Sequence, residues 1–152
     1  MQFSLFSHQY WIAEAIELAK NSNINEVPVA ALIVCDNNLI AGAVNRVQEH
    51  HDATSHAEIL AIKEASRVLG NWRLNNCTLY TTLEPCPMCA GAILNSRISK
   101  IVFGAYDLNY GVYGSKINLL KLLERENQVE IIGGILEFEC SNLLKDFFLV
   151  RR

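Results

Sequence analysis

The sequence predicts an α/β fold in which helices cover a β-sheet. Segments with apolar residues at helical spacing alternate along the chain with short apolar runs typical of strands. Hydrophobic residues make up 51% of the chain and charged residues 19%, which excludes a disordered protein. The length of 152 residues is close to that of one ordinary domain, so we expect a single domain over residues 1–152.

The N-terminal third predicts a helix and then two strands. Ser7 is a suitable N-cap residue for a helix that ends at residues 21–23. The apolar residues at helical spacing in this segment are Trp11, Ile12, Ala15, Ile16 and Ala19. Residues 27–35 form a nearly continuous apolar run, typical of a buried strand. Residues 36–38 favour a turn, and an apolar run returns over residues 39–44. We therefore expect these two strands to form an antiparallel hairpin.

The middle of the chain predicts a loop, a helix, a strand and a short helix. A polar loop covers residues 45–55, and a helix with one broad apolar face begins at His56 and stops at Gly70. Residues 77–83 alternate in polarity, as a strand does. The Pro-Cys-Pro sequence at residues 85–87 then opens a short helix.

The last third predicts two further strands and two further helices. We expect a strand at residues 100–106, a glycine-rich loop at 107–115, a helix at 116–126, a strand at 129–132 and a closing helix at 136–150. A helix between the last two strands permits them to be parallel.

Charge and hydropathy narrow the class of protein. The net charge of −3 counts against a non-specific nucleic-acid binder, since such proteins are usually basic, so any nucleic-acid partner must meet a local patch. No apolar run approaches the roughly 18 residues that cross a membrane, and residues 1–8 lack the features of a signal peptide. We therefore expect a cytoplasmic protein with no membrane contact.

Five cysteines, an odd number, predict reduced thiols rather than a disulfide framework in a chain without a signal peptide. Cys35 lies in an apolar strand, Cys140 in a helix and Cys77 at the start of a strand, so we expect all three to be structural residues. Cys86 and Cys89 differ from these three cysteines, because they form a Cys-x-x-Cys pair. The pair lies at the start of the predicted short helix, and Cys86 has a proline on each side.

Two short segments together indicate a chemistry. His56-Ala57-Glu58 and the Pro-Cys-x-x-Cys sequence at residues 85–89 are each weak signals alone. Together they match the signature of zinc-dependent deaminases. Cys86 and Cys89 are three residues apart at a helix start, so both sulfurs can point to one place, where the helix N-terminus favours thiolates.

His56 and Glu58 are two residues apart and do not share a side of a helix, so a joint site requires the metal to lie off the helix end. His56, Cys86 and Cys89 would then bind zinc and leave one position for water, which is typical of a catalytic site. Glu58 would be the base that moves protons between water and substrate. The spacing leaves open a closed structural zinc site, completed by one of Cys35, His50, His51, Cys77 and Cys140, and a redox-active Cys-x-x-Cys pair.

The chain resembles the bacterial tRNA-specific adenosine deaminases of the cytidine deaminase-like superfamily nearly from end to end. The shared motifs include residues 6–8, 26–29, 45–46, 51–52, 56–59, 78–80, 82–92, 102–105, 114–115 and 146–148, with Asp107, Gly111 and the final two arginines. The resemblance implies a three-layer α/β/α sandwich with a five-stranded mixed sheet. It further implies a homodimer with one Zn²⁺ per subunit that converts the wobble adenosine of a tRNA anticodon stem-loop to inosine.

The resemblance also suggests roles for single residues. His56, Cys86 and Cys89 are implied to bind zinc, and Glu58 to shuttle protons. Asn45 resembles an amide that contacts the flipped base, and Asp107 a residue beside the flanking nucleotides, where it could accept from a ribose 2′-OH. Arg151 and Arg152 are candidates for phosphate contacts. Each of these residues also has a simpler interpretation. Asn45 could only end a strand, Asp107 could only cap its loop, and the two arginines could belong to a solvated tail.

Some positions depart from the residues usual in that family, namely Ala30, Val47, Ala53, residues 109–110, Tyr113 and Leu149. They bear on RNA binding rather than on the reaction. Two other functions stay open: a zinc-dependent deaminase of a free nucleobase or nucleoside, of the guanine or cytosine type, and a zinc-stabilised RNA-binding module without catalysis. The net charge favours the former slightly, and Glu58 counts against the latter because a closed zinc site needs no adjacent base.

Overall fold

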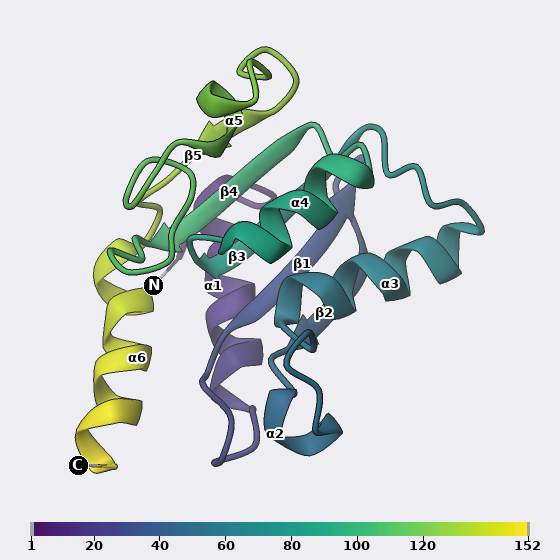
Figure 1. The fold of residues 1–152 in the computed structure, drawn as a ribbon. Helices are drawn as coiled ribbons and strands as arrows, with labels where there is room; N and C mark the ends of the chain where they lie inside the picture. The colour runs from purple at the N-terminus through teal and green to yellow at the C-terminus, as the bar shows by residue number, and fades with distance from the viewer. Residues whose placement is uncertain (1, 152) are drawn as a thin grey trace.

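A computed structural model describes residues 2–151 and shows a five-stranded mixed sheet with helices on both faces (Figure 1). The strands are β1 (Ala30–Cys35), β2 (Asn38–Val44), β3 (Cys77–Leu83), β4 (Lys100–Ala105) and β5 (Glu130–Ile132). Their order across the sheet is β2-β1-β3-β4-β5. The β1 strand is antiparallel to β2 and β3, whereas β3, β4 and β5 are parallel, so the predicted hairpin and the predicted parallel pair are both confirmed.

Two layers of helices complete the sandwich. On one face lie α1 (His8–Lys20) and α6 (Glu137–Val150), and on the other α3 (Ala57–Leu69) and α4 (Pro87–Asn95). Alternate residues of the strands enter two separate clusters: Ala31 and Ile33 pack under α3, and Ala30 and Leu32 under α1. The expected α/β/α sandwich is therefore confirmed.

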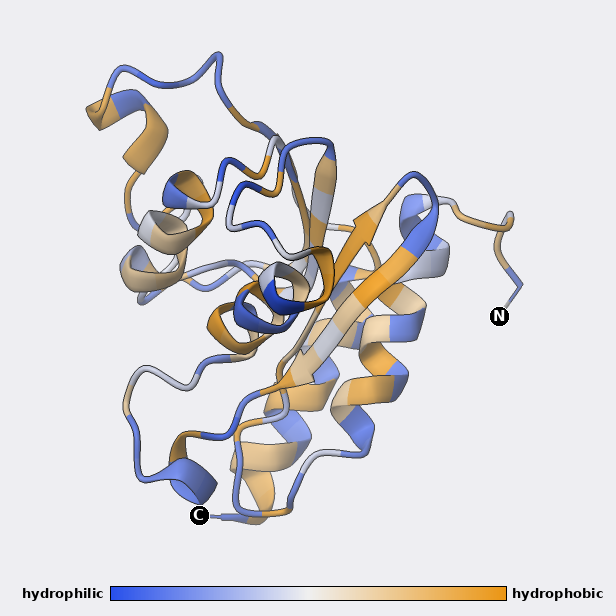
Figure 2. Cartoon of the chain, turned by 90° about the vertical axis from the view of Figure 1, so that its right-hand side faces the viewer, coloured by the Kyte–Doolittle hydropathy of each residue, from blue (hydrophilic) through white to orange (hydrophobic). Residues whose placement is uncertain are grey.

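The helix ends follow the local rules of the sequence. Ser7 caps α1 and accepts a hydrogen bond from the Tyr10 backbone N–H. Gly70 ends α3 in the left-handed conformation, with a φ of 63°. Pro87 is the first residue of α4, where its missing N–H costs nothing. In Figure 2 the strands are mostly orange and the connecting loops mostly blue, as a core buried between two polar surfaces requires.

Two elements differ from the sequence-based expectation. The helix expected over residues 116–126 is a single turn, α5 (Leu119–Leu122), because most of this segment is exposed and little apolar surface supports a longer helix. The loop after β2 contains one helical turn, α2 (Val47–His50), that no apolar periodicity marked. Within residues 2–151 no helix has the length and apolar character needed to cross a membrane.

The prediction that all cysteines are reduced is wrong for one pair. Cys35 at the end of β1 and Cys77 at the start of β3 are directly opposite in the antiparallel ladder, with Cα atoms 4.5 Å apart, and they form a disulfide. The other cysteines, Cys86, Cys89 and Cys140, are free. The pairing depends on the register of two strands that are 42 residues apart in sequence, so cysteine spacing alone did not reveal it.

Candidate active site

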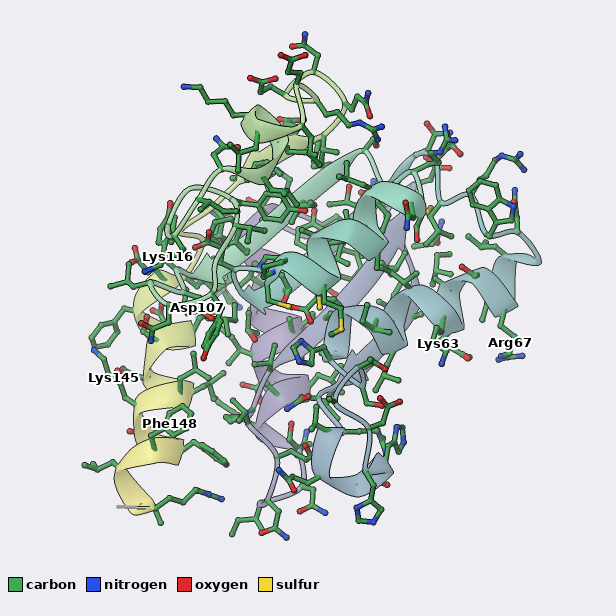
Figure 3. All side chains as sticks on the ribbon, in the orientation of Figure 1. Lys63, Arg67, Asp107, Lys116, Lys145 and Phe148 are labelled. Carbon is green, nitrogen blue, oxygen red and sulfur yellow. A yellow bond between two sulfur atoms is a disulfide. The ribbon has the colours of Figure 1, made fainter. Side chains whose placement is uncertain are left out.

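Two helices begin at the same place and bring three metal-binding side chains together. His56 is the N-cap residue of α3, Cys86 is the N-cap residue of α4, and Cys89 lies in the first turn of α4. The imidazole nitrogen and the two sulfurs all lie within 4.8 Å of one another. The two helices lie side by side on one face of the sheet, and yellow sulfur atoms lie between them in Figure 3.

The spacing of these donor atoms fits zinc. Nδ1 of His56 lies 3.6 Å from Sγ of Cys86 and 3.5 Å from Sγ of Cys89. A tetrahedral zinc ion, bonded to sulfur at about 2.3 Å and to nitrogen at about 2.0 Å, holds such atoms about 3.6 Å apart. One imidazole and two thiolates therefore provide three of four tetrahedral positions.

The charges of the group depend on its internal hydrogen bonds. A hydrogen bond from the Cys89 thiol, supported by one from His56, lowers the pKa of Cys86 to about 4. The same bond, together with burial, raises the pKa of Cys89. The hydrogen bond with Cys86 also raises the pKa of His56. A divalent cation at this position would favour the thiolate form of both sulfurs.

Glu58 is buried beside the three donors but is not one of them. It is 4% exposed; its Oε1 accepts a hydrogen bond from the Thr81 hydroxyl at 3.3 Å, and its Oε2 lies 3.4 Å from Sγ of Cys89. Burial raises the pKa of its carboxyl group. A carboxyl group with a raised pKa next to a metal centre is suited to take up and release a proton.

The centre opens into a cavity of about 950 Å³. His56, Glu58 and Cys86 lie on its wall, together with residues of the loop after β4 and of α6. Asp107 and Phe148, labelled in Figure 3, come from that loop and from α6. The volume of the cavity lies within the range of about 300–1,000 Å³ that small-molecule sites occupy.

Two of the predicted substrate-binding residues line this cavity. The Asn45 side-chain amide donates to the carbonyl of Val27 at 3.5 Å, and its buried Oδ1 has no partner among the described residues. Asp107 caps its own loop, since its Oδ1 accepts from the N–H groups of Asn109 and Tyr110. The capping contacts use one of the two carboxylate oxygens of Asp107.

The predicted arginines lie elsewhere. Arg151 is exposed, and its guanidinium donates hydrogen bonds to the backbone carbonyls of Phe147 and Ile24. The guanidinium carbon also lies 3.5 Å from the centre of the Phe147 ring. Arg151 does not line the cavity. Arg152 lies outside the residues that the structure describes.

Sequence reasoning missed a further buried glutamate on the wall of the cavity. Glu84 is 1% exposed, and its carboxylate accepts from the backbone N–H groups of Asp107, Tyr113 and Ser115 at 2.9–3.2 Å and from the Ser115 hydroxyl. The sequence contained one signal for the importance of Glu84. It is an acidic residue between an apolar strand and the Pro-Cys-x-x-Cys segment, where a surface residue is not expected.

Comparisons with known proteins agree with this geometry. The family described as "Cytidine and deoxycytidylate deaminase zinc-binding region" matches residues 6–105. A tRNA-specific adenosine deaminase of Bacillus subtilis (strain 168) is 45% identical over 141 residues, which cover 92% of this chain and 88% of that protein.

Solved structures with similar folds include two kinds of deaminase. A structure from a study of A-to-I editing by tRNA deaminases at the wobble position is 35% identical, with a TM-score of 0.84, and covers 89% of this chain and 99% of its own. A guanine deaminase from Nitrosomonas europaea is 26% identical, with a TM-score of 0.81, and covers 95% of this chain and 86% of its own. The chain therefore belongs to the zinc-binding cytidine and deoxycytidylate deaminase family and, within it, to the tRNA-specific adenosine deaminases.

Proposed function

We propose that this protein is a zinc-dependent hydrolase that deaminates adenosine to inosine at the wobble position of a tRNA anticodon loop. The observation that carries the proposal is the buried, non-ligating Glu58 beside a three-donor metal centre at the wall of an open cavity. Its support from relatives is the 45% identity to a tRNA-specific adenosine deaminase.

The proposed roles follow from position. His56, Cys86 and Cys89 hold the metal, and bound zinc supplies a water molecule of lowered pKa. Glu58 takes a proton from the attacking water at one carboxylate oxygen and delivers it to a ring nitrogen of the base. It then takes the second proton of the same water oxygen, now bonded to the base, and delivers it to the amine, which departs as ammonia. The products are inosine and ammonia, so one water is consumed for each adenosine.

The walls of the cavity would hold and orient the base. Asn45 offers a buried amide oxygen without a partner, which could accept a hydrogen bond from the target base. Asp107 keeps one carboxylate oxygen for a ribose hydroxyl of a neighbouring nucleotide. Arg151 and Arg152 would contact phosphates outside the cavity.

We also propose a homodimer with one zinc ion per subunit that acts in the cytoplasm, where tRNA is found. The small residues 90–92 of α4 favour close packing against another helix, and a Cβ added at Gly91 would meet no atom within 4 Å.

A deaminase of free guanine or cytosine is the second candidate, because the guanine deaminase of Nitrosomonas europaea has the same fold. Ammonia release from an anticodon stem-loop, free adenosine, guanine, cytosine and cytidine would separate the two functions. We expect the stem-loop to react fastest. Faster reaction of any free base or nucleoside would overturn the tRNA proposal, and no release from any of them would favour an RNA-binding module.

A further inference from the structure

Large side chains around the mouth of the cavity are left uncovered. Tyr106, Leu108, Tyr110 and Phe148 all line it, and their exposed fractions are 43%, 75%, 68% and 52%. Single exposed apolar residues are common on any protein, but a group of them around a cavity marks a surface that a ligand covers.

The backbone of Tyr110 is held by hydrogen bonds within its loop. The Asp107 side chain accepts its N–H at 3.1 Å, and the next residue, Gly111, donates to the Asp107 carbonyl at 2.8 Å. Asp107 is itself bonded through its N–H to the buried carboxylate of Glu84. The backbone beneath the ring is thus fixed before any ligand binds, which lowers the entropic cost of binding.

The ring itself is free to take a partner. The aromatic pairs found among residues 2–151 involve other rings, including the pair of Tyr106 with Phe103 and the pair of Phe148 with Phe147. Tyr110 is therefore a largely exposed ring at the mouth of the cavity that stacks on no other aromatic ring among the described residues.

Charge decides what part of an RNA can lie against this ring. Among the described residues that line the cavity, none is Lys or Arg, whereas Glu58, Glu84 and Asp107 are acidic. Lys116 and Lys145, labelled in Figure 3, are not part of the lining. The lining therefore offers a phosphate no cationic partner, so we expect a nucleotide inside the cavity mouth to be held by its base or its ribose. Aromatic rings stack on any base, because every base has a π-face.

We propose that Tyr110 stacks on a nucleobase adjacent to the target adenosine and so determines how tightly an RNA loop is bound. Asp107 and Glu84 are positioning residues for this contact. The inference rests on the proposed function, since it assumes an RNA loop as substrate. One stacked base contributes about 5- to 150-fold in affinity.

The test removes each side of the contact in turn. The dissociation constant of an anticodon stem-loop is measured for the parent protein and for Tyr110→Phe, Tyr110→Ala and Phe138→Ala. Phe138 is a matched control, because it is 70% exposed on α6 and does not line the cavity. Each protein is also measured with stem-loops that carry an abasic site on the 5′ or 3′ side of the target, and the zinc content of every variant is recorded.

We expect Tyr110→Ala to weaken binding by about 5- to 150-fold, while Tyr110→Phe and Phe138→Ala bind like the parent. One abasic site should weaken the parent and Tyr110→Phe by a similar factor, yet have little further effect on Tyr110→Ala. Equal losses from the abasic site in the parent and in Tyr110→Ala would overturn the stacking proposal while leaving the function intact. A parent that releases no ammonia from the intact stem-loop would overturn the proposed function, and this inference with it.

Discussion

The carboxylate of Glu84 accepts a hydrogen bond from the backbone N–H of Tyr113 at 2.9 Å. The same carboxylate accepts from Asp107 and Ser115, so it ties three points of the loop after β4 to the end of β3. Glu84 is separated from Cys86 by one residue. The loop that lines the cavity is therefore held beside the metal centre by this buried side chain, together with a hydrogen bond from the Val112 N–H to the Pro85 carbonyl.

Replacing Glu84 by Gln should destabilise the protein and weaken RNA binding. An NH₂ group would then face backbone N–H donors, and each buried donor left without an acceptor costs about 1–3 kcal/mol. We expect the free energy of unfolding to fall by about 2–4 kcal/mol, as measured by urea denaturation, and amide exchange at Tyr113 and Ser115 to accelerate.

Glu64→Gln is the control for that substitution. Glu64 pairs with Arg67 on the surface of α3, and such pairs contribute less than about 1 kcal/mol. If Glu84→Gln changes stability no more than this control does, Glu84 is not the anchor of the loop.

Glu58→Ala should retain zinc and fold while losing turnover. Glu58 is buried but is outside the group of three donor atoms. Acid–base groups contribute roughly 10²- to 10⁴-fold, and one residue serves several transfers here, so the loss should reach or exceed the upper value. Ammonia release under saturating stem-loop checks this, and activity within tenfold of the parent would contradict the role.

Cys86→Ser and Cys89→Ser should each lower zinc content and stability together. A serine hydroxyl stays protonated at neutral pH and is a poor zinc ligand. Elemental analysis after exposure to a chelator measures the effect. Cys140→Ser, which alters a buried free thiol in α6, should keep its zinc. Full occupancy in either ligand variant would disprove the assignment of that ligand.

Removing Arg151 and Arg152 together should flatten the salt dependence of stem-loop binding. Each lost phosphate contact lowers the slope of log affinity against log salt by roughly one unit, so we expect a change of about one to two units. Arg67→Ala is the control, because Figure 3 shows Arg67 on α3, on the opposite side of the molecule from α6. An unchanged slope would exclude the two terminal arginines from the RNA contact.

The Cys35–Cys77 disulfide predicts a thiol count. Unfolded protein without zinc or reductant should show three reactive thiols, from Cys86, Cys89 and Cys140, and five after reduction. Titration with a thiol reagent in denaturant distinguishes these values. Five reactive thiols before reduction would show that the two strands pair without the covalent bond.

The sequence alone determined the features that depend on neighbouring residues. Ser7, Gly70 and Pro87 fixed helix ends through backbone geometry, and the apolar runs fixed the strands, because caps and periodicity act over a few residues. The presence of both a His-x-Glu segment and a Cys-x-x-Cys segment could also be recognised from the sequence alone.

Only the tertiary structure decided which distant groups meet. The disulfide needed the register of β1 against β3, and the role of Glu84 needed the return of a loop 23–31 residues later in the chain to the end of β3. Long segments separate these partners, and many chain paths are compatible with the same local pattern. Packing of the whole sheet selects one path, and with it the side chains that surround the metal centre.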